Sequence, residues 1–429
     1  MGFGRAMNGN DLVFVKCAWR LIPFLMLLYL LNFLDRVNVG FAALTMNRDL
    51  NFTPEIYGFG AGILFFSYAF LQLPANLIFE RLGARRWVFI MLMAWGTISA
   101  SFAFIQDATS FYVLRFLLGA AEAGFFPGMI YYLTLWFPQS YRARFTAMFI
   151  TAQPFAFIIG GPLSTLILGM DGVAGLRGWQ WLFLIEGVPA ALLAFVVLRW
   201  LPDGPATASW LTANEKAAIA TRLAAEQTTV HRDFLPALRD ARVWVLGLVA
   251  LGQNCAAYGV QLWLPQIVQG MGFSIRATGF VVALPFAAVI VAMVLCGRSS
   301  DRSGERVWHV ALPLLIAASA FFIAGLAPSD VIVLAALAFV VVSLDTGIGV
   351  FWTLPSTFLA GSAAAGGIAL VRTISALGGF AGPAIVGLLR GATGDYAAAM
   401  TALGCGLVLS ALLVLGLGKA MASRKVQLS

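Results

Sequence analysis

Long apolar runs occupy almost the whole sequence, and each is long enough to cross a lipid bilayer. About 20 residues of α-helix span the roughly 30 Å hydrocarbon core of a membrane. Because lipid offers no hydrogen-bond partner to a free backbone group, each run should be helical. The runs therefore predict an all-α integral membrane protein with twelve transmembrane helices. They lie near residues 19–42, 57–79, 87–106, 110–136, 143–168, 179–200, 242–268, 278–297, 307–326, 331–359, 365–389 and 396–418.

The distribution of charge supports a lipid environment and excludes several other classes. Only 11% of the residues are charged, whereas soluble domains carry about 25%. The net charge of +8 comes from basic residues in short loops, which argues against a nucleic-acid partner. The sequence has no CxxC pair, no clustered histidines and no phosphate-cradling loop. We therefore expect no enzyme activity, no metal and no cofactor. We expect the coupling ion to be a proton.

A polar stretch at residues 201–241 divides the apolar runs six and six. The sequence predicts an N-terminal bundle at 1–200, a cytoplasmic linker at 201–241 and a C-terminal bundle at 242–429. The linker, both termini and the loops on their side hold most of the lysines and arginines, whereas the alternate loops hold few. Because basic loops stay on the cytoplasmic side, both termini should be cytoplasmic in a bacterial inner membrane.

An internal repeat supports this division. The loop after the second run contains acid-Arg-x-Gly-x-Arg, and the loop after the eighth run contains the same pattern. Internal repeats are typical of secondary transporters. The residues concerned are Glu80, Arg81, Gly83 and Arg85 in the first copy and Asp301, Arg302, Gly304 and Arg306 in the second.

Several ionisable side chains lie at membrane depth, where each costs roughly 2.5–3.5 kcal/mol at a helix centre unless it is paired or hydrated. Such residues therefore mark functional sites or buried ion pairs. Glu186 is a weaker case because it lies nearer the end of its run. The others are Asp35 and Arg36 in the first run, Arg115 and Glu122 in the fourth, Asp345 in the tenth and Arg372 in the eleventh.

Their spacing limits how these groups can pair. Asp35 and Arg36 project about 100° apart on a helix. Arg115 and Glu122 share a face but are about 10 Å apart along the axis, which leaves room for a cavity and disfavours a direct ion pair. An arginine presents a fork that matches a carboxylate, and a nearby carboxylate can accept a proton when an anion occupies that arginine. The alternative is a structural pair, such as Asp35 with Arg115.

The motifs resemble those of a known family. The repeated acid-Arg-x-Gly-x-Arg loop is similar to the signature of the major facilitator superfamily. Asn32-Phe33-Leu34-Asp35-Arg36-Val37-Asn38, the Arg115–Gly128 stretch and the Trp179–Gly187 stretch resemble the anion:cation symporter family within it. The resemblance is closest to the bacterial tartrate, phthalate and hydroxyphenylacetate branch. It implies two six-helix bundles that work by alternating access, with the two loops as conformational gates.

The resemblance also implies roles for the buried charges. In that family the counterpart of Arg36 binds the substrate carboxylate. The counterparts of Asp35 and Glu122 carry protons, and the counterpart of Arg115 adjusts the proton affinity of the glutamate. The second half departs from the family pattern at Arg372 and Asp345. Either Arg372 clamps a second carboxylate opposite Arg36, or it pairs with Asp345. Further candidate binding residues are the polar and aromatic side chains Tyr29, Gln153, Tyr258, Trp263, Trp352 and Ser375.

Taken together, these features predict proton-coupled uptake of a small organic anion by a monomer in the bilayer. The anion is expected to be a carboxylate, with a dicarboxylate and an aromatic acid as the two candidates. The alternative is a proton-coupled antiporter that exports an organic anion or a drug. Arginines at depth argue against a cationic drug.

Overall fold

The computed structural model describes residues 9–226, 238–359 and 361–428, and the regular structure in these ranges is helical throughout. The helices of the first half are α1 (Gly9–Asp49), α2 (Pro54–Leu82), α3 (Ala84–Ser101), α4 (Ala108–Glu122), α5 (Phe125–Trp136), α6 (Gln139–Ile150), α7 (Ala152–Leu168) and α8 (Gly178–Trp200). Those of the linker and second half are α9 (Ala213–Ala224), α11 (Ala241–Gly270), α12 (Ile275–Ser303), α13 (Val307–Leu326), α14 (Asp330–Thr346), α15 (Ile348–Phe351), α16 (Gly361–Thr393) and α17 (Ala397–Leu428). Short 3-10 turns occur at Phe102–Phe104, Val173–Gly175, Pro205–Thr207 and Pro355–Thr357.

The prediction of twelve spans is confirmed. Within the described residues, 12 helical segments are long and apolar enough to cross a membrane. Helices α4 and α5 together form one of these segments, as do α6 and α7. Large apolar side chains such as Leu284 (74% exposed) and Val331 (76% exposed) cover the outer faces, as expected for surfaces that contact lipid rather than water.

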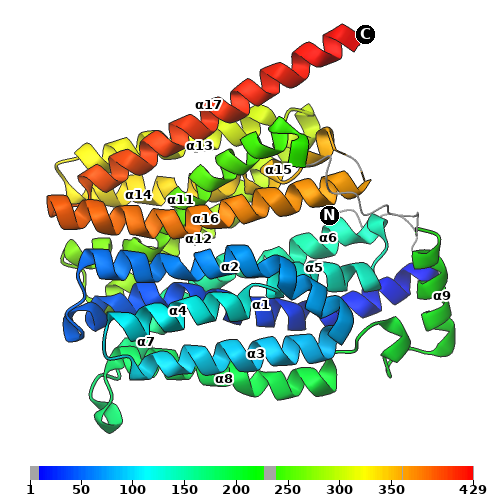
Figure 1. Ribbon diagram of the computed structural model, residues 1–429, viewed down its shortest axis with the longest axis horizontal. Coiled ribbons are helices and arrows are strands. Elements are labelled where there is room, and N and C mark those ends of the chain that lie inside the picture. Colours follow the sequence, from blue (N-terminus) through cyan, green and yellow to red (C-terminus); the bar gives the residue numbers. More distant parts are fainter. Residues whose placement is uncertain (1–8, 227–237, 360, 429) are drawn as a thin grey trace.

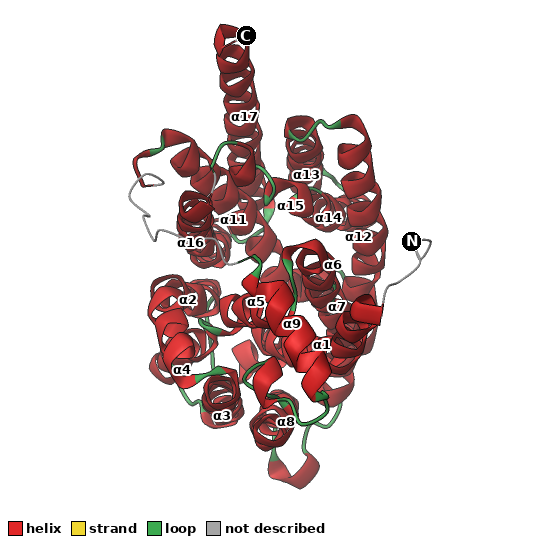
Figure 2. Cartoon of the chain, turned by 90° about the vertical axis from the view of Figure 1, so that its right-hand side faces the viewer, coloured by secondary structure: helices red, strands yellow, loops and turns green. Residues whose placement is uncertain are grey.

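The helices form two bundles that lie side by side. Figure 1 shows α1 to α8 in the lower half and α11 to α17 in the upper half, all running roughly along the long axis. The start of α1 and the end of α17 both lie toward the right, so this is the termini end of the molecule. Figure 2 views the molecule from that end and shows the two bundles one above the other. The predicted fold of two six-helix bundles is confirmed.

Several spans are interrupted beside polar residues. The fourth span breaks between α4 and α5, directly after Glu122. The fifth span breaks at Thr151 between α6 and α7. Pro154 explains this second break, because its ring nitrogen cannot donate to the carbonyl of Ile150 one turn earlier.

The two bundles pack closely at the end opposite the termini. The Tyr57 hydroxyl donates to the Leu262 carbonyl (2.6 Å), and the Asn47 amide donates to the Gln266 side chain (3.3 Å). Helices α7 and α12 touch through Gly161 and Gly279, where a Cβ on either glycine would collide with the carbonyl of the other. This end of the interface is therefore closed in the structure.

The start of the linker is docked on the N-terminal bundle. The Lys16 ammonium forms an ion pair with Glu215 at the start of α9 (2.8 Å). The Arg20 guanidinium lies between the rings of Trp200 (5.5 Å) and Trp210 (5.3 Å), measured to the ring centroids. These contacts attach α9 to the termini end of α1.

Candidate functional site

A buried ion pair connects the first and fourth spans. The Arg36 Nε of α1 donates to Oε2 of Glu122 at the end of α4, over 2.6 Å. Arg36 is 6% exposed and Glu122 is fully buried. The structure thus joins two residues that the sequence analysis placed in the site with separate roles.

The same guanidinium is only partly satisfied. Its carbon lies 4.6 Å from the centroid of the Tyr68 ring and 5.4 Å from that of Phe33. Among the described residues, Arg36 Nη2 has no hydrogen-bond partner, and the same holds for Glu122 Oε1. Buried donors and acceptors are almost always paired in proteins. An unpaired arginine nitrogen at this depth therefore indicates a place for a ligand or water.

Arg372 reaches the interface from the other bundle. Its guanidinium carbon lies 4.2 Å from the centroid of the Phe126 ring on α5 and 4.7 Å from that of Trp352. In the part of the chain that the structure describes, no ion pair joins Arg372 to Asp345. The structural pairing that the sequence left open is therefore not what the structure contains.

Tyrosine hydroxyls surround both arginines. Tyr29, Tyr68 and Tyr258 each interact electrostatically with Arg36 and with Arg372. The Tyr29 ring stacks at 4.5 Å on Phe149, and the Tyr258 ring lies 4.1 Å from that of Phe65. The two guanidinium groups therefore face one region lined by aromatic rings and hydroxyl groups from both bundles.

The other charged residues of the N-terminal bundle lie behind this region. Asp35 accepts a hydrogen bond from the Ser99 hydroxyl (2.6 Å). Arg115 donates to the carbonyls of Gly60 (3.2 Å) and Ala61 (2.8 Å). The alternative of an Asp35–Arg115 ion pair is therefore wrong for this structure.

Three further candidates lie in packing contacts. Trp263 donates to the Pro383 carbonyl (3.1 Å) at the closed end of the interface. The Ser375 hydroxyl accepts from the Asn254 amide (2.7 Å). Gln153 is half-buried on α7, beside the break before Pro154. These side chains tie helices together or border the interface, and their role in binding stays a prediction.

The first repeated loop anchors the linker. Gly83 has φ +79°, a conformation that favours glycine, at the turn between α2 and α3. The Arg85 side chain donates to the Leu201 carbonyl (2.9 Å), and its backbone N–H donates to Asp203 (2.9 Å). The neighbouring Arg81 is exposed, as is Glu80.

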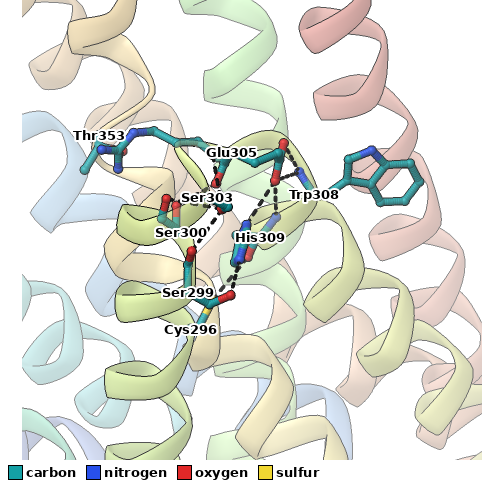
Figure 3. A network of polar contacts seen from close by, with 9 residues as sticks. Cys296, Ser299, Ser300, Ser303, Glu305, Trp308, His309 and Thr353 are labelled. Atoms are coloured by element: carbon teal, nitrogen blue, oxygen red, sulfur yellow. Dashed lines mark hydrogen bonds and ion pairs between the residues drawn. The ribbon is translucent and has the colours of Figure 1, made fainter.

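The second repeated loop caps α13, as Figure 3 shows. Glu305 accepts from the Trp308 backbone N–H (2.8 Å) and contacts the His309 ring (2.9 Å). Arg306 donates to Thr353 (3.0 Å) and lies 3.6 Å from Asp301. Gly304 again has positive φ (+68°), and Arg302 is exposed beside it. The contacts of Arg85 and Arg306 each stay within one bundle or its linker.

Two functional candidates were missed from sequence. Tyr68 and Phe126 contact the two arginines, yet each is one aromatic residue among many in apolar runs. The polar pair Ser67-Tyr68 within a lipid-spanning stretch is the one signal that singles out Tyr68. Phe126 carries no such signal.

Comparisons with known proteins place the chain in a family. The family description of the Major Facilitator Superfamily matches residues 25–383. A protein of Agrobacterium vitis named "Putative tartrate transporter" is 45% identical over 416 residues, covering 96% of this chain and 93% of that protein. A "Quinolone resistance transporter" of Acinetobacter baumannii is 43% identical over 389 residues, covering 89% of each.

A solved structure supports the same fold. A bacterial homologue of the human lysosomal transporter Spinster, in an inward-facing and occupied conformation, has a TM-score of 0.78 to this structure at 17% identity. The alignment covers 96% of this chain and 97% of that one. The expectation of a transporter rather than an enzyme is confirmed, as is the resemblance to the tartrate branch. The chain belongs to the Major Facilitator Superfamily.

Proposed function

We propose that the chain couples proton entry to uptake of a small organic anion that carries at least one carboxylate. The observation that carries this proposal is the half-satisfied Arg36 guanidinium, whose Nε is held by Glu122 while Nη2 has no partner among the described residues. A carboxylate can accept two parallel hydrogen bonds from such a group. Arg36 is therefore assigned as the primary anion-binding residue.

The second arginine favours an anion with two acidic groups or with an acid and several hydroxyls. Arg372 faces the same tyrosines as Arg36 and has no carboxylate partner in the described residues. Tyrosine hydroxyls can donate to the middle of a hydroxylated substrate. The name of the Agrobacterium relative, which refers to tartrate, agrees with a hydroxylated dicarboxylate.

Coupling of the anion to a proton follows from competition between the substrate carboxylate and Glu122 for Arg36. A carboxylate substrate that bonds to Arg36 weakens the contact between this arginine and Glu122. A fully buried carboxylate that loses its counter-charge takes up a proton, because the charged form is poorly solvated there. Anion and proton therefore bind together. The proton also offsets the cost of moving a negative charge against an inside-negative potential, about 2.3 kcal/mol per charge per 100 mV.

The closed end of the interface is consistent with one of the two conformations of an alternating-access cycle. If the basic termini end is cytoplasmic, the Tyr57–Leu262 and Asn47–Gln266 contacts close the periplasmic side. Transport then requires these contacts to separate while the cytoplasmic side closes.

The proposal is tested with purified protein in proteoliposomes. An inward proton gradient should drive accumulation of labelled tartrate or a related carboxylate, and Arg36→Gln should abolish it. Glu122→Gln should retain exchange of labelled for unlabelled anion but lose gradient-driven accumulation. If both variants accumulate every tested carboxylate as the unchanged protein does, the proposal is overturned. Arg48→Gln, which alters an exposed arginine, is the control.

A second function is export of an aromatic acid by proton antiport. The aromatic rings of Phe126, Trp352 and Tyr258 beside the arginines favour an aromatic carboxylate, and a relative is named for quinolone resistance. In the same vesicles, an outward proton gradient would then drive uptake. The direction of the driving gradient separates the two functions.

A further inference from the structure

The buried charges of the N-terminal bundle do not balance. Among its described side chains, three acids and two arginines are at least nine-tenths buried: Asp35, Glu122, Glu186, Arg36 and Arg115. Arg36 is paired with Glu122, while the described hydrogen bonds of Arg115 go to backbone carbonyls. One carboxyl group is therefore in excess.

The two remaining acids are neighbours. The structure records no ion pair for Asp35 or Glu186 in its described ranges. The Asn38 amide donates to Asp35 at 3.5 Å and also interacts with Glu186, whose charge interacts with that of Asp35. Asn38 thus lies between the two carboxyl groups.

Each acid is bound by a serine on one oxygen only. Ser99 donates to Oδ1 of Asp35 over 2.6 Å, and Ser164 donates to Oε1 of Glu186 over 3.2 Å. The second oxygen of each acid and the Asn38 Oδ1 have no partner among the described residues. Three unpartnered acceptors in one buried cluster indicate a place for a proton, a cation or water, because buried acceptors are otherwise satisfied.

The helix geometry separates this cluster from the anion site. Consecutive residues of α1 point about 100° apart, so Arg36 faces α2 and α4 while Asp35 faces Ser99 of α3. Glu186 comes from α8, on the same side as Asp35. The two acids therefore lie behind the Arg36–Glu122 pair.

We propose that Asp35 and Glu186 share one proton through this cluster and form a second coupling site, with Glu186 as its previously unassigned member. The assignment rests on the proton-coupled function proposed above. Two buried carboxylates without a counter-ion cannot both be ionised at moderate cost, so one of the two is protonated.

The shared proton responds to the charge of the anion site. Besides Glu186, Asp35 interacts electrostatically with Glu122 and Arg115, whose charges act on it in opposite directions. When Glu122 takes up a proton, Asp35 loses a negative neighbour and its carboxylate form becomes more favourable. The shared proton is then held less tightly, but it stays with the pair while the anion is bound, so anion binding still gives net proton uptake.

Infrared spectroscopy on the purified full-length protein tests the pair without any substrate. All samples carry Asp345→Asn, because the buried Asp345 has no ion pair among the described residues and would give a band of its own. In this background the otherwise unchanged protein should show the C=O band of a protonated carboxyl at neutral pH. Glu186→Gln should remove this band, because the new amide can donate to Asp35 and stabilise its carboxylate. Asp35→Asn should remove the same band, because its new amide can donate to Glu186 and stabilise that carboxylate. Glu215→Gln, which makes the same change on the exposed linker, should leave the band intact.

Two results would overturn the assignment. One is a band that persists in both Glu186→Gln and Asp35→Asn. The other is a rise in the thermal unfolding midpoint when NaCl replaces choline chloride, present in the unchanged protein and absent in Glu186→Gln, because the cluster would then hold sodium.

Transport gives an independent readout. In proteoliposomes, Glu186→Gln should keep anion exchange within about twofold, and its proton-to-anion ratio should fall by about one. If the unchanged protein shows no gradient-driven uptake, the proposed function is wrong. The infrared result then still decides whether Asp35 and Glu186 share a proton. If uptake is present and the proton-to-anion ratio is unchanged in Glu186→Gln, the second coupling site is wrong while the proposed function stands.

Discussion

The guanidinium of Arg372 lies 4.2 Å from the centroid of the Phe126 ring, and the two residues belong to different bundles. A cation–π contact of this kind contributes about 0.5–2 kcal/mol. Arg372 can therefore hold the bundles together when no anion is bound and turn to the anion when it arrives. The contact makes Arg372 a part of the interface, and its role in anion binding stays a prediction.

Replacing Arg372 should separate two classes of substrate. Arg372→Gln should weaken binding of dicarboxylates by about tenfold or more, since a charge-assisted hydrogen bond contributes about 1.5–3 kcal/mol. Monocarboxylate binding through Arg36 should change much less. Thermal-shift titration with matched mono- and dicarboxylates measures both. Equal losses for the two classes, or no loss for either, would show that Arg372 does not bind a second carboxylate.

Arg115 should matter more for stability than for anion binding. Its guanidinium satisfies the Gly60 and Ala61 carbonyls in a site that is 1% exposed. Arg115→Met removes both charge-assisted hydrogen bonds to these helical carbonyls and should lower the free energy of unfolding by about 1.5–3 kcal/mol. Urea unfolding in detergent, with Arg276→Met as the exposed control, gives the comparison. A variant as stable as the control would contradict this structural role.

Closure of one end of the interface depends on two glycines that admit a close helix contact. Gly279→Leu should force α7 and α12 apart, because any Cβ there meets the backbone of Gly161. A cysteine placed at Asn47 should then react faster with a thiol reagent. Gly297→Leu on the same helix is the matched control, since nothing lies within 4 Å of a Cβ at that position. Equal labelling rates in the two variants would argue against closure by this contact.

Docking of α9 should depend on acid pH. The hydrogen bond from Lys16 holds the pKa of Glu215 below its ordinary value. A carboxyl group with a lowered pKa stabilises the docked state above its ordinary pKa, and this contribution is lost as pH falls through the lowered value. Fluorescence of Trp210, which stacks on Trp136 at 5.5 Å, should therefore stay constant from pH 7 down to about pH 5 and change below that.

Two variants separate this titration from general acid unfolding. Glu215→Gln should abolish the acid transition of the Trp210 signal, and high salt should weaken docking in the unchanged protein. A transition of the same midpoint in Glu215→Gln would assign the change to another group.

Much of the fold and part of the site follow from sequence because the bilayer imposes strong rules. Apolar runs of membrane-spanning length fixed the twelve spans, and the cost of a buried charge identified Asp35, Arg36, Arg115 and Glu122. The interaction partners of these four residues could not be predicted from the sequence. Arg36 and Glu122 are 86 residues apart, and their contact depends on the rotation of α1 against the break after α4.

The aromatic part of the site was the least predictable. Tyr68 and Phe126 lie on helices rich in similar residues, so no periodicity separates a ring beside an arginine from one beside lipid. Trp263 and Ser375 show the reverse case: both stand out in the sequence and both make helix–helix contacts, while their role in binding stays a prediction. Only the three-dimensional packing distinguishes these cases.

The central claim is that an anion displaces Glu122 from Arg36 and so causes a proton to bind. The most direct measurement is proton uptake, followed by a pH-indicator dye in weakly buffered solution, when the purified protein binds a saturating carboxylate. The account predicts net proton uptake by the unchanged protein and its loss in Glu122→Gln, which should still bind the anion. Anion binding without proton uptake in the unchanged protein, or equal uptake in Glu122→Gln, would contradict it.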